Sequence, residues 1–176
     1  MVWKHTSSDT PKKFKVTPIC WESQGYCFGD CKGVMMTDYL SKNSTVTGVY
    51  YADELRKLRE AMKKKRWGKL RHWVLLQHDN APAHTSAVAS AAAECGYELL
   101  PHPPYSPDLA PSDFYLFPLL KEHFSGTHFS SDNDVIASVE VFLQGQNELF
   151  YKTGIQKLQK QWNKCIEVGG DCVEKN

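Results

Sequence analysis

The pattern of apolar and polar residues changes along the first half of the chain. Val34 to Leu40 is an apolar run after Gly33, and Thr45 to Val49 is rich in β-branched residues, so both segments are predicted to be strands. From Tyr50 to Arg66, charged residues separate apolar residues at helical spacing. These apolar positions are Leu55, Leu58 and Met62. This period predicts an amphipathic helix.

The next pattern is that of a strand, a helix and a second strand. Trp73 to Leu76 is a short continuous apolar run, which predicts a strand covered on both faces, and Tyr97 to Leu100 is a second short strand. Asn80 as cap and Pro82 in the first turn indicate the start of the helix, and Gly96 ends it. Its predicted buried side consists of Ala87, Val88, Ala91, Ala92 and Cys95. The order of elements predicts parallel strands.

A proline-rich segment from Pro101 to Pro111 follows, and its prolines exclude regular structure. Ser112 is a good N-cap for a further helix, with Asp113 in its first turn. Pro118 should kink this helix.

Two more helices are predicted at the end of the chain. The first spans Asp134 to Tyr151 with an interruption at Gly145, and the second spans Thr153 to Val168. One face of the second helix carries Ile155, Leu158, Trp162 and Ile166. We expect a single α/β domain, because no long linker or repeat divides the chain.

Composition fits this picture. The chain has 176 residues, of which 41% are apolar, enough for one sizeable core. No apolar run approaches the roughly 18 residues of a membrane span, and the first residues resemble no signal peptide, so we expect a soluble intracellular protein. Its six cysteines are sparse and uneven, which indicates reduced thiols.

Local charge is more informative than the net charge of +1. Basic clusters lie at Lys12 to Lys15, in an edge strand or extended arm, and at Lys63 to Arg66. Cations at Lys63 to Arg66 suit the negative pole of a helix end. A phosphate-binding patch and a nuclear import signal are the alternatives.

Two carboxylates are the candidate site. Asp79 follows a predicted strand, and Asp113 lies in the first turn of the helix reached from the neighbouring strand. The topology therefore places both at one edge of the sheet. Such oxygen ligands suit Mg²⁺ or Mn²⁺, and two such ions can promote phosphoryl displacement. Each aspartate also suits a simple helix-capping role.

The sequence motifs around these aspartates are more specific than their positions alone. His78 to His84 and Pro103 to Phe114 closely resemble two signature segments of mariner-type DNA transposases, in the Tc1/mariner group. The resemblance also covers Trp3 to Pro18, Asp30 to Arg66 and the end of the chain from Gly154 to Cys165. It implies an RNase H-like catalytic core in which three acidic residues hold two metal ions.

The resemblance also implies roles for particular residues. Asp79 matches the second acidic ligand and Asp113 the third, which makes them the candidate catalytic and metal-binding residues. The loop that pairs two transposase subunits matches Tyr105, Ser106, Pro107, Asp108 and Leu109. Candidate DNA contacts are Lys12, Lys13, Lys15 and His84. The implied partners are transposon DNA and a second subunit, in the nucleus, with no membrane and no small-molecule substrate.

The sequence departs from the family in three ways. The family's first catalytic aspartate and its DNA-binding region would lie upstream of Trp3, so we expect the first strand of the core to be missing. Ile19 to Gly29 does not match the family's second strand, and we hypothesise two compensating frameshifts that damage it. Asp79 and Asp113 enclose 33 residues, one fewer than usual in mariner elements, which could misaim Asp113.

These departures divide the expected transposase fragment into an arm with a damaged strand (1–33), a core with the metal-site motifs (34–124) and C-terminal helices (125–176). They predict that the chain is inactive by itself. The alternatives are a remnant that binds DNA or pairs with another subunit, and the transposase part of a histone methyltransferase fusion.

Other residues suggest other chemistry. A zinc site or a histidine base is an alternative suggested by His78, His84 and His102. Part of a zinc knot could be imitated by Cys20, Cys27 and Cys31. Neither set has the ligand spacing typical of zinc. Nucleic-acid bases could stack on the side chains of Trp3, Trp73 and Trp162. Apolar neighbours in the sequence favour core packing for Trp73 and Trp162.

Overall fold

The computed structural model describes residues 25–41, 44–71, 73–78, 85–103 and 106–169. Several residues singled out by the sequence lie outside these ranges: Trp3, Lys12, Lys13, Lys15, Cys20, Asp79, Asn80, Pro82, His84 and Tyr105. Predictions for these residues remain predictions. None of the described helices is long and apolar enough to cross a bilayer.

A β-hairpin opens the described part of the chain. Strand β1 (Gly25–Asp30) pairs antiparallel with β2 (Gly33–Tyr39). Strand β2 corresponds to the strand predicted over Val34 to Leu40. The turn is closed by the positive φ of Gly33 and by a hydrogen bond from the Lys32 amide to Asp30 Oδ1. A bulge opposite Phe28 and Gly29 leaves one extra residue in β2.

Residues 25–29 form a strand even though their sequence departs from the family's second strand. Tyr26 and Phe28 alternate with less bulky residues and pack against the core, and the turn fixes the register, so this segment forms a regular strand. Residues 19–24 lie outside the described ranges, so the frameshift hypothesis is untested.

Helix α1 (Gly48–Lys65) follows the hairpin and carries much of the core. The predicted strand over Thr45 to Val49 is wrong, because Thr47 Oγ1 accepts a hydrogen bond from the Tyr50 amide and caps the helix. The predicted apolar side of the helix is confirmed. Leu55, Leu58 and Met62 are buried. A 3₁₀ helix, η1 (Trp67–Arg71), then leads to the next strand.

The predicted strand–helix–strand unit is confirmed. Strands β3 (Val74–Gln77) and β4 (Tyr97–Leu100) pair in parallel, and α2 (Thr85–Glu94) lies between them in the chain. Four of the five residues predicted on the buried side of α2 are buried, and Ala87 is half-buried. Gly96 ends the segment with φ of +68°.

The prediction that β3 is covered on both faces is wrong. Val74 and Leu76 pack against the core, but Trp73 and Leu75 are 68% and 62% exposed. Within the described residues, β3 and β4 form a separate two-stranded sheet, so only one of its faces meets α1 and α2.

The remaining elements are helical. They are the 3₁₀ turn η3 (Pro107–Leu109), the π-helical turn η4 (Ser112–Leu116), and the helices α3 (Phe117–His123), α4 (Asp132–Gly145) and α5 (Glu148–Glu167). The change from η4 to α3 occurs beside Pro118, where a kink was predicted.

The predicted boundary between the last two helices is too late. Gly145 ends α4, and Asn147 Oδ1 accepts a hydrogen bond from the Phe150 amide, so α5 already begins at Glu148.

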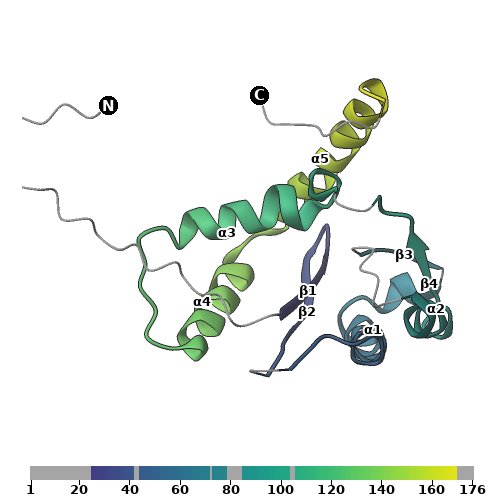
Figure 1. The fold of residues 1–176 in the computed structure, drawn as a ribbon, viewed down its shortest axis with the longest axis horizontal. Coiled ribbons are helices and arrows are strands. Elements are labelled where there is room, and N and C mark those ends of the chain that lie inside the picture. Colours follow the sequence, from purple (N-terminus) through teal and green to yellow (C-terminus); the bar gives the residue numbers. More distant parts are fainter. Residues whose placement is uncertain (1–24, 42–43, 72, 79–84, 104–105, 170–176) are drawn as a thin grey trace, which may run out of the picture.

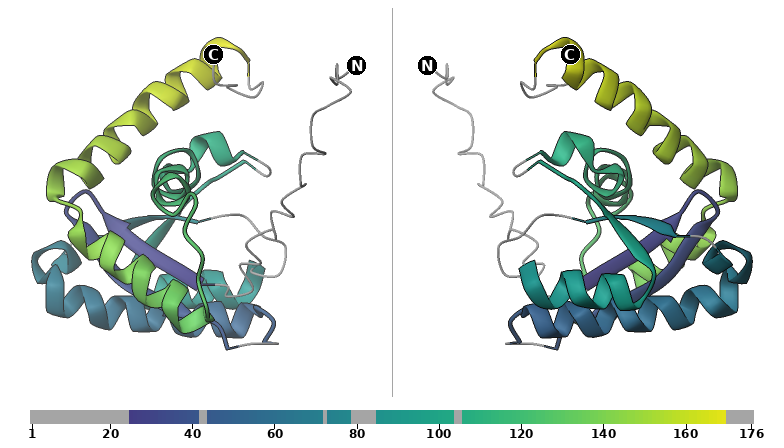
Figure 2. Two further views of the ribbon diagram at one scale, coloured as in Figure 1. Left: turned by 90° about the vertical axis from the view of Figure 1, so that its left-hand side faces the viewer. Right: turned by 90° about the vertical axis from the view of Figure 1, so that its right-hand side faces the viewer.

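The layers are clear in Figure 1. The hairpin lies between α1 on one side and α3 and α4 on the other. Tyr26 and Phe28 face the cluster formed with α1, whereas Cys27 and Val34 face the cluster of α3 and α4. Figure 2 shows α5 projecting from this body as a long helix.

The apolar stripe on α5 is less covered than its pattern predicts. The contacts that anchor this helix involve its first half, where Phe150 packs in the α3–α4 cluster. Farther along, Trp162 is 38% and Ile166 is 77% exposed. Core packing is therefore incomplete for Trp162 and is wrong for Trp73.

Candidate metal and nucleic-acid site

Asp113 lies in the first turn of a helical segment, as predicted. The amides of Asp113 and Phe114 both donate to the carbonyl of Ala110, at 2.9 and 3.1 Å, so the chain turns before Ser112. Pro111, with helical φ and ψ, occupies the cap position, and no side chain caps the turn. The predicted capping role of Ser112 is therefore wrong. The Asp113 side chain is exposed.

Gln77 joins the end of β3 to the segment that leads to Asp113. Its Nε2 donates to the Leu109 carbonyl at 2.7 Å and lies 3.4 Å from Nδ1 of His102. A side-chain amide nitrogen carries two protons, so it can serve both partners. One residue therefore links β3, the exit of β4 and η3. Sequence reasoning missed Gln77, although a polar residue just before His78 and Asp79 was a usable signal.

The loop assigned to subunit pairing is well anchored where it is described. Leu109 is buried, with 6% of its surface exposed, and its amide donates to the Ser106 carbonyl at 3.1 Å. Pro107 is exposed, and Ser106 and Asp108 are half-buried. Leu109 and Gln77 together hold this loop against the end of β3.

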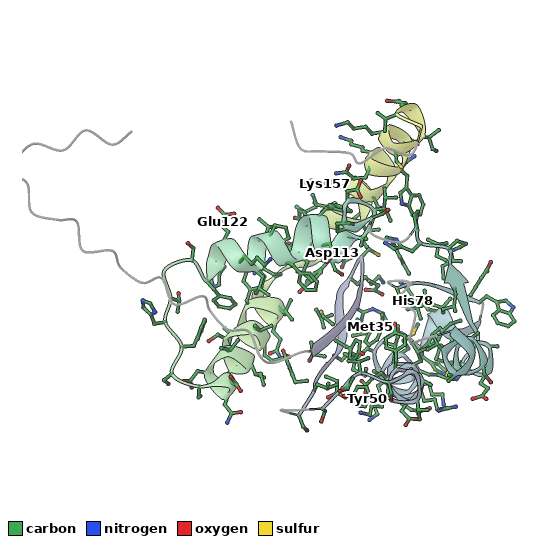
Figure 3. The ribbon with its side chains drawn as sticks, viewed as in Figure 1. Met35, Tyr50, His78, Asp113, Glu122 and Lys157 are labelled. Atoms are coloured by element: carbon green, nitrogen blue, oxygen red, sulfur yellow. The ribbon has the colours of Figure 1, made fainter. Side chains whose placement is uncertain are left out.

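Helix α5 packs closely against the turn that carries Asp113. A Cβ on Gly154 would lie 2.5 Å from Cδ1 of Tyr115, so only glycine permits this approach. Lys157, one turn farther along α5, places Nζ 4.7 Å from the centroid of the Tyr115 ring. Figure 3 shows Lys157 on α5 and Asp113 below it, beside the segment that leads into α3. No local pattern in the sequence indicated the Tyr115–Lys157 contact.

The alternative zinc chemistry finds no support in the described residues. None of their His, Cys, Asp and Glu side chains form a group of three that could hold a metal ion. Burial, together with the nearby Glu140, raises the pKa of the Cys27 thiol to about 12, so Cys27 stays protonated. The ring of His78 stacks on Tyr51 at 5.8 Å.

The basic cluster at the end of α1 is largely engaged by the protein itself. Lys63 pairs with Glu60 at 2.5 Å, Lys65 donates to the Met35 carbonyl at 2.9 Å, and Arg66 pairs with Asp30 at 3.1 Å. Burial opposes ionisation of Asp30, but hydrogen bonds from Lys69, Arg66 and the Lys32 amide outweigh it and lower the pKa of Asp30. These contacts favour a structural role for the cluster.

The structure thus describes only part of the predicted site. Asp113 and the positions 106–109 are in place, whereas Asp79, His84, Tyr105 and the lysines of the arm lie outside the described residues. The distance between the two aspartates, and with it the effect of the short spacing, is untested.

Relatives with similar sequences identify the class of protein. A family model described as "Transposase (partial DDE domain)" matches residues 1–72. The Mariner Mos1 transposase of Drosophila mauritiana is 35% identical over 173 residues, which cover 96% of this chain and 48% of that protein. The histone-lysine N-methyltransferase SETMAR of Homo sapiens is 33% identical over 162 residues, 91% of this chain and 22% of that protein. The chain spans about half of the first relative and less of the second.

Solved structures agree. The Mos1 catalytic domain with raltegravir and Mg has a TM-score of 0.81 and 34% identity, covering 86% of this chain and 77% of that one; the domain has also been solved with Mn. A Mos1 paired-end complex with the left transposon end has a TM-score of 0.81 and 32% identity, covering 98% and 49%. The predicted RNase H-like fold is confirmed. The chain belongs to the mariner-type transposases and corresponds to their catalytic domain.

Proposed function

We propose that this chain is part of a DNA transposase that cuts phosphodiester bonds and joins the freed strand to target DNA. Family membership supports the reaction class. The observation that carries the site is the hydrogen bond from Gln77 to Leu109, because it ties the strand that leads to Asp79 to the loop that leads to Asp113.

We further propose that Asp79 and Asp113 hold the divalent ions, Mg²⁺ or Mn²⁺, with two ions in a complete site. Asp113 fits this role because its carboxylate is exposed at the start of a helical segment and offers hard oxygen ligands. Bound ions would stabilise the attacking and leaving oxygens of an in-line displacement. The contribution of this chain is positional, since Gln77 and Tyr115 fix the backbone on either side of Asp113.

The proposed site needs a third acidic ligand. The resemblance assigns three aspartates, and these 176 residues match two of them. We therefore propose that the chain by itself does not cleave DNA. A first aspartate supplied upstream would complete the site.

The test is a nicking assay on supercoiled DNA with Mg²⁺ or Mn²⁺. The chain alone should not nick the DNA. Nicking that depends on Asp79 would overturn the proposal that its site is incomplete. A fusion that places the segment preceding the matched region of the Drosophila mauritiana transposase before this chain should nick in a metal-dependent way. Asp79→Ala and Asp113→Ala should each abolish that activity. A folded fusion that leaves DNA intact would sink the catalytic proposal.

A second candidate function is subunit pairing without catalysis. It is favoured by the anchored loop, in which Leu109 is buried while Pro107 is exposed. In this case the chain should form homodimers, measurable by light scattering. Pro107→Asp should weaken them, whereas Pro103→Asp, at an exposed position in the preceding loop, should not.

Two further proposals concern cellular context. A nuclear location follows from a DNA substrate and is tested by imaging a tagged chain. A fusion to a histone methyltransferase has some support from the human relative, which this chain matches over 22% of its length. Sequencing complete transcripts decides whether such a domain, or a first aspartate, is joined to this chain.

A further inference from the structure

Three lysines share one side of α5. Lys157, Lys160 and Lys164 are spaced by three and four residues, which places them on the same side of a helix. All three side chains are exposed. From the first to the last, this lysine face spans about 10 Å along the helix axis, at 1.5 Å per residue.

The charges of this lysine face are not neutralised within the described structure. The ion pairs among the described residues include none from Lys157, Lys160 or Lys164. The end of α1 differs, because Lys63 and Arg66 there are held by Glu60 and Asp30. A lysine that makes no ion pair can bind an external anion without first breaking one.

The lysine face begins against η4, the turn that carries Asp113. Lys157 lies over the ring of Tyr115, which is two residues from Asp113, and the close Gly154–Tyr115 contact fixes α5 in this position. A polyanion bound across η4 could therefore continue along α5.

We propose that Lys157, Lys160 and Lys164 bind the phosphate backbone of DNA next to the bond that the metal site would cut. This inference rests on the proposed function and adds a contact surface to it. DNA is the favoured polyanion because the chain belongs to a family of DNA transposases and the lysine face adjoins η4, the turn that carries Asp113. Its length corresponds to about three nucleotides at 3.4 Å per step of one strand. Lysines that make no ion pair within the protein suit contacts that do not depend on sequence.

The experiment measures binding of this chain to a labelled 30-base-pair duplex by fluorescence anisotropy, in EDTA, between 50 and 200 mM KCl. Each phosphate contact contributes about 0.9 to the slope of log affinity against log salt, so three contacts contribute about 2.7. Over this fourfold range of salt, the unchanged chain should lose about 40-fold more affinity than Lys157→Gln/Lys160→Gln/Lys164→Gln.

The matched control is Lys63→Gln/Lys64→Gln/Lys65→Gln, which removes the same charge from the end of α1. Its slope should stay close to that of the unchanged chain. Equal losses in both triple variants would show an effect of net charge alone and overturn the proposal, as would a chain that binds no DNA at 50 mM KCl. Both variants must first show the unchanged circular dichroism spectrum.

Competition identifies the class of partner. Unlabelled duplex should displace the probe at lower concentrations than polyglutamate of equal charge, and the reverse order would assign the lysine face to an acidic protein. A lysine-dependent slope in a fusion that fails to nick would refute the proposed catalysis while supporting this surface.

Discussion

The ring of Tyr115 rests on the backbone of Gly154, so closely that a Cβ at Gly154 would come within 2.5 Å of Cδ1 of Tyr115. Glycine inside a helix costs about 1 kcal/mol relative to alanine. Here its lack of a side chain lets α5 approach η4, the turn that carries Asp113. The geometry of the candidate site thus depends on a residue about 40 positions away in the chain.

Gly154→Ala should lower the free energy of unfolding by about 1 to 3 kcal/mol, because overpacking at Tyr115 outweighs the gain in helix propensity. Urea denaturation measures the change. In the Tyr115→Ala background the same substitution should be neutral or stabilising, which gives a coupling energy of at least about 1 kcal/mol. If Gly154→Ala stabilises the unmodified chain, the close contact is refuted.

Gln77→Glu keeps the shape of the side chain but removes both donors, so the Leu109 carbonyl should lose its partner. The expected cost is about 1 to 3 kcal/mol. Hydrogen exchange should accelerate at the amides of Leu109 and Ala110, which close η3. Gln159→Glu, an exposed change on α5, serves as control. Unchanged exchange at both amides would show that Gln77 does not hold the loop.

Local patterns predicted much of this fold. The buried residues Leu55, Leu58 and Met62 follow a period that the helix itself imposes, and Gly96 ends the α2 segment through its own φ. The position of Asp113 in the first turn of a helical segment was likewise predicted from its neighbours in the sequence. Such features depend on neighbours within a few residues, which a sequence displays directly.

Features that depend on distant partners could not be predicted in this way. The exposure of Trp73 and Leu75 follows from which strands pair, and an apolar run does not encode that. The roles of Gln77 and Tyr115 each depend on a residue more than 30 positions away. Gly154, a glycine inside an amphipathic pattern, was the best available signal of close packing.

Glu54 should make stability depend on pH. Its side chain is 0% exposed, and Oε1 accepts a hydrogen bond from Lys57 at 2.7 Å. Burial raises the pKa of Glu54 above its ordinary 4.5; Lys57 opposes this shift and Asp38 adds to it. A raised folded-state pKa favours folding at low pH, and this contribution is lost as the pH rises through the folded value.

Glu54→Gln removes that titration while keeping an oxygen for Lys57. The variant should therefore gain stability relative to the unchanged chain as the pH rises from 4 to 8, measured by urea denaturation at each pH. Glu60→Gln, at an exposed site in the same helix, should show no such gain, because burial hardly affects it. A difference that shrinks with rising pH would show that the Glu54 pKa is lowered instead.

Cys27 should react more slowly than Cys31 and Cys165. Burial and the nearby Glu140 raise its pKa to about 12, so it carries almost no thiolate at pH 8. Cys31 in the hairpin turn and Cys165 on α5 are half-buried. Alkylation of the native chain with iodoacetamide, followed by mass spectrometry, should modify these two before Cys27. In 8 M urea all three rates should converge, since unfolding removes the burial, and early native labelling of Cys27 would contradict its place in the α3–α4 cluster.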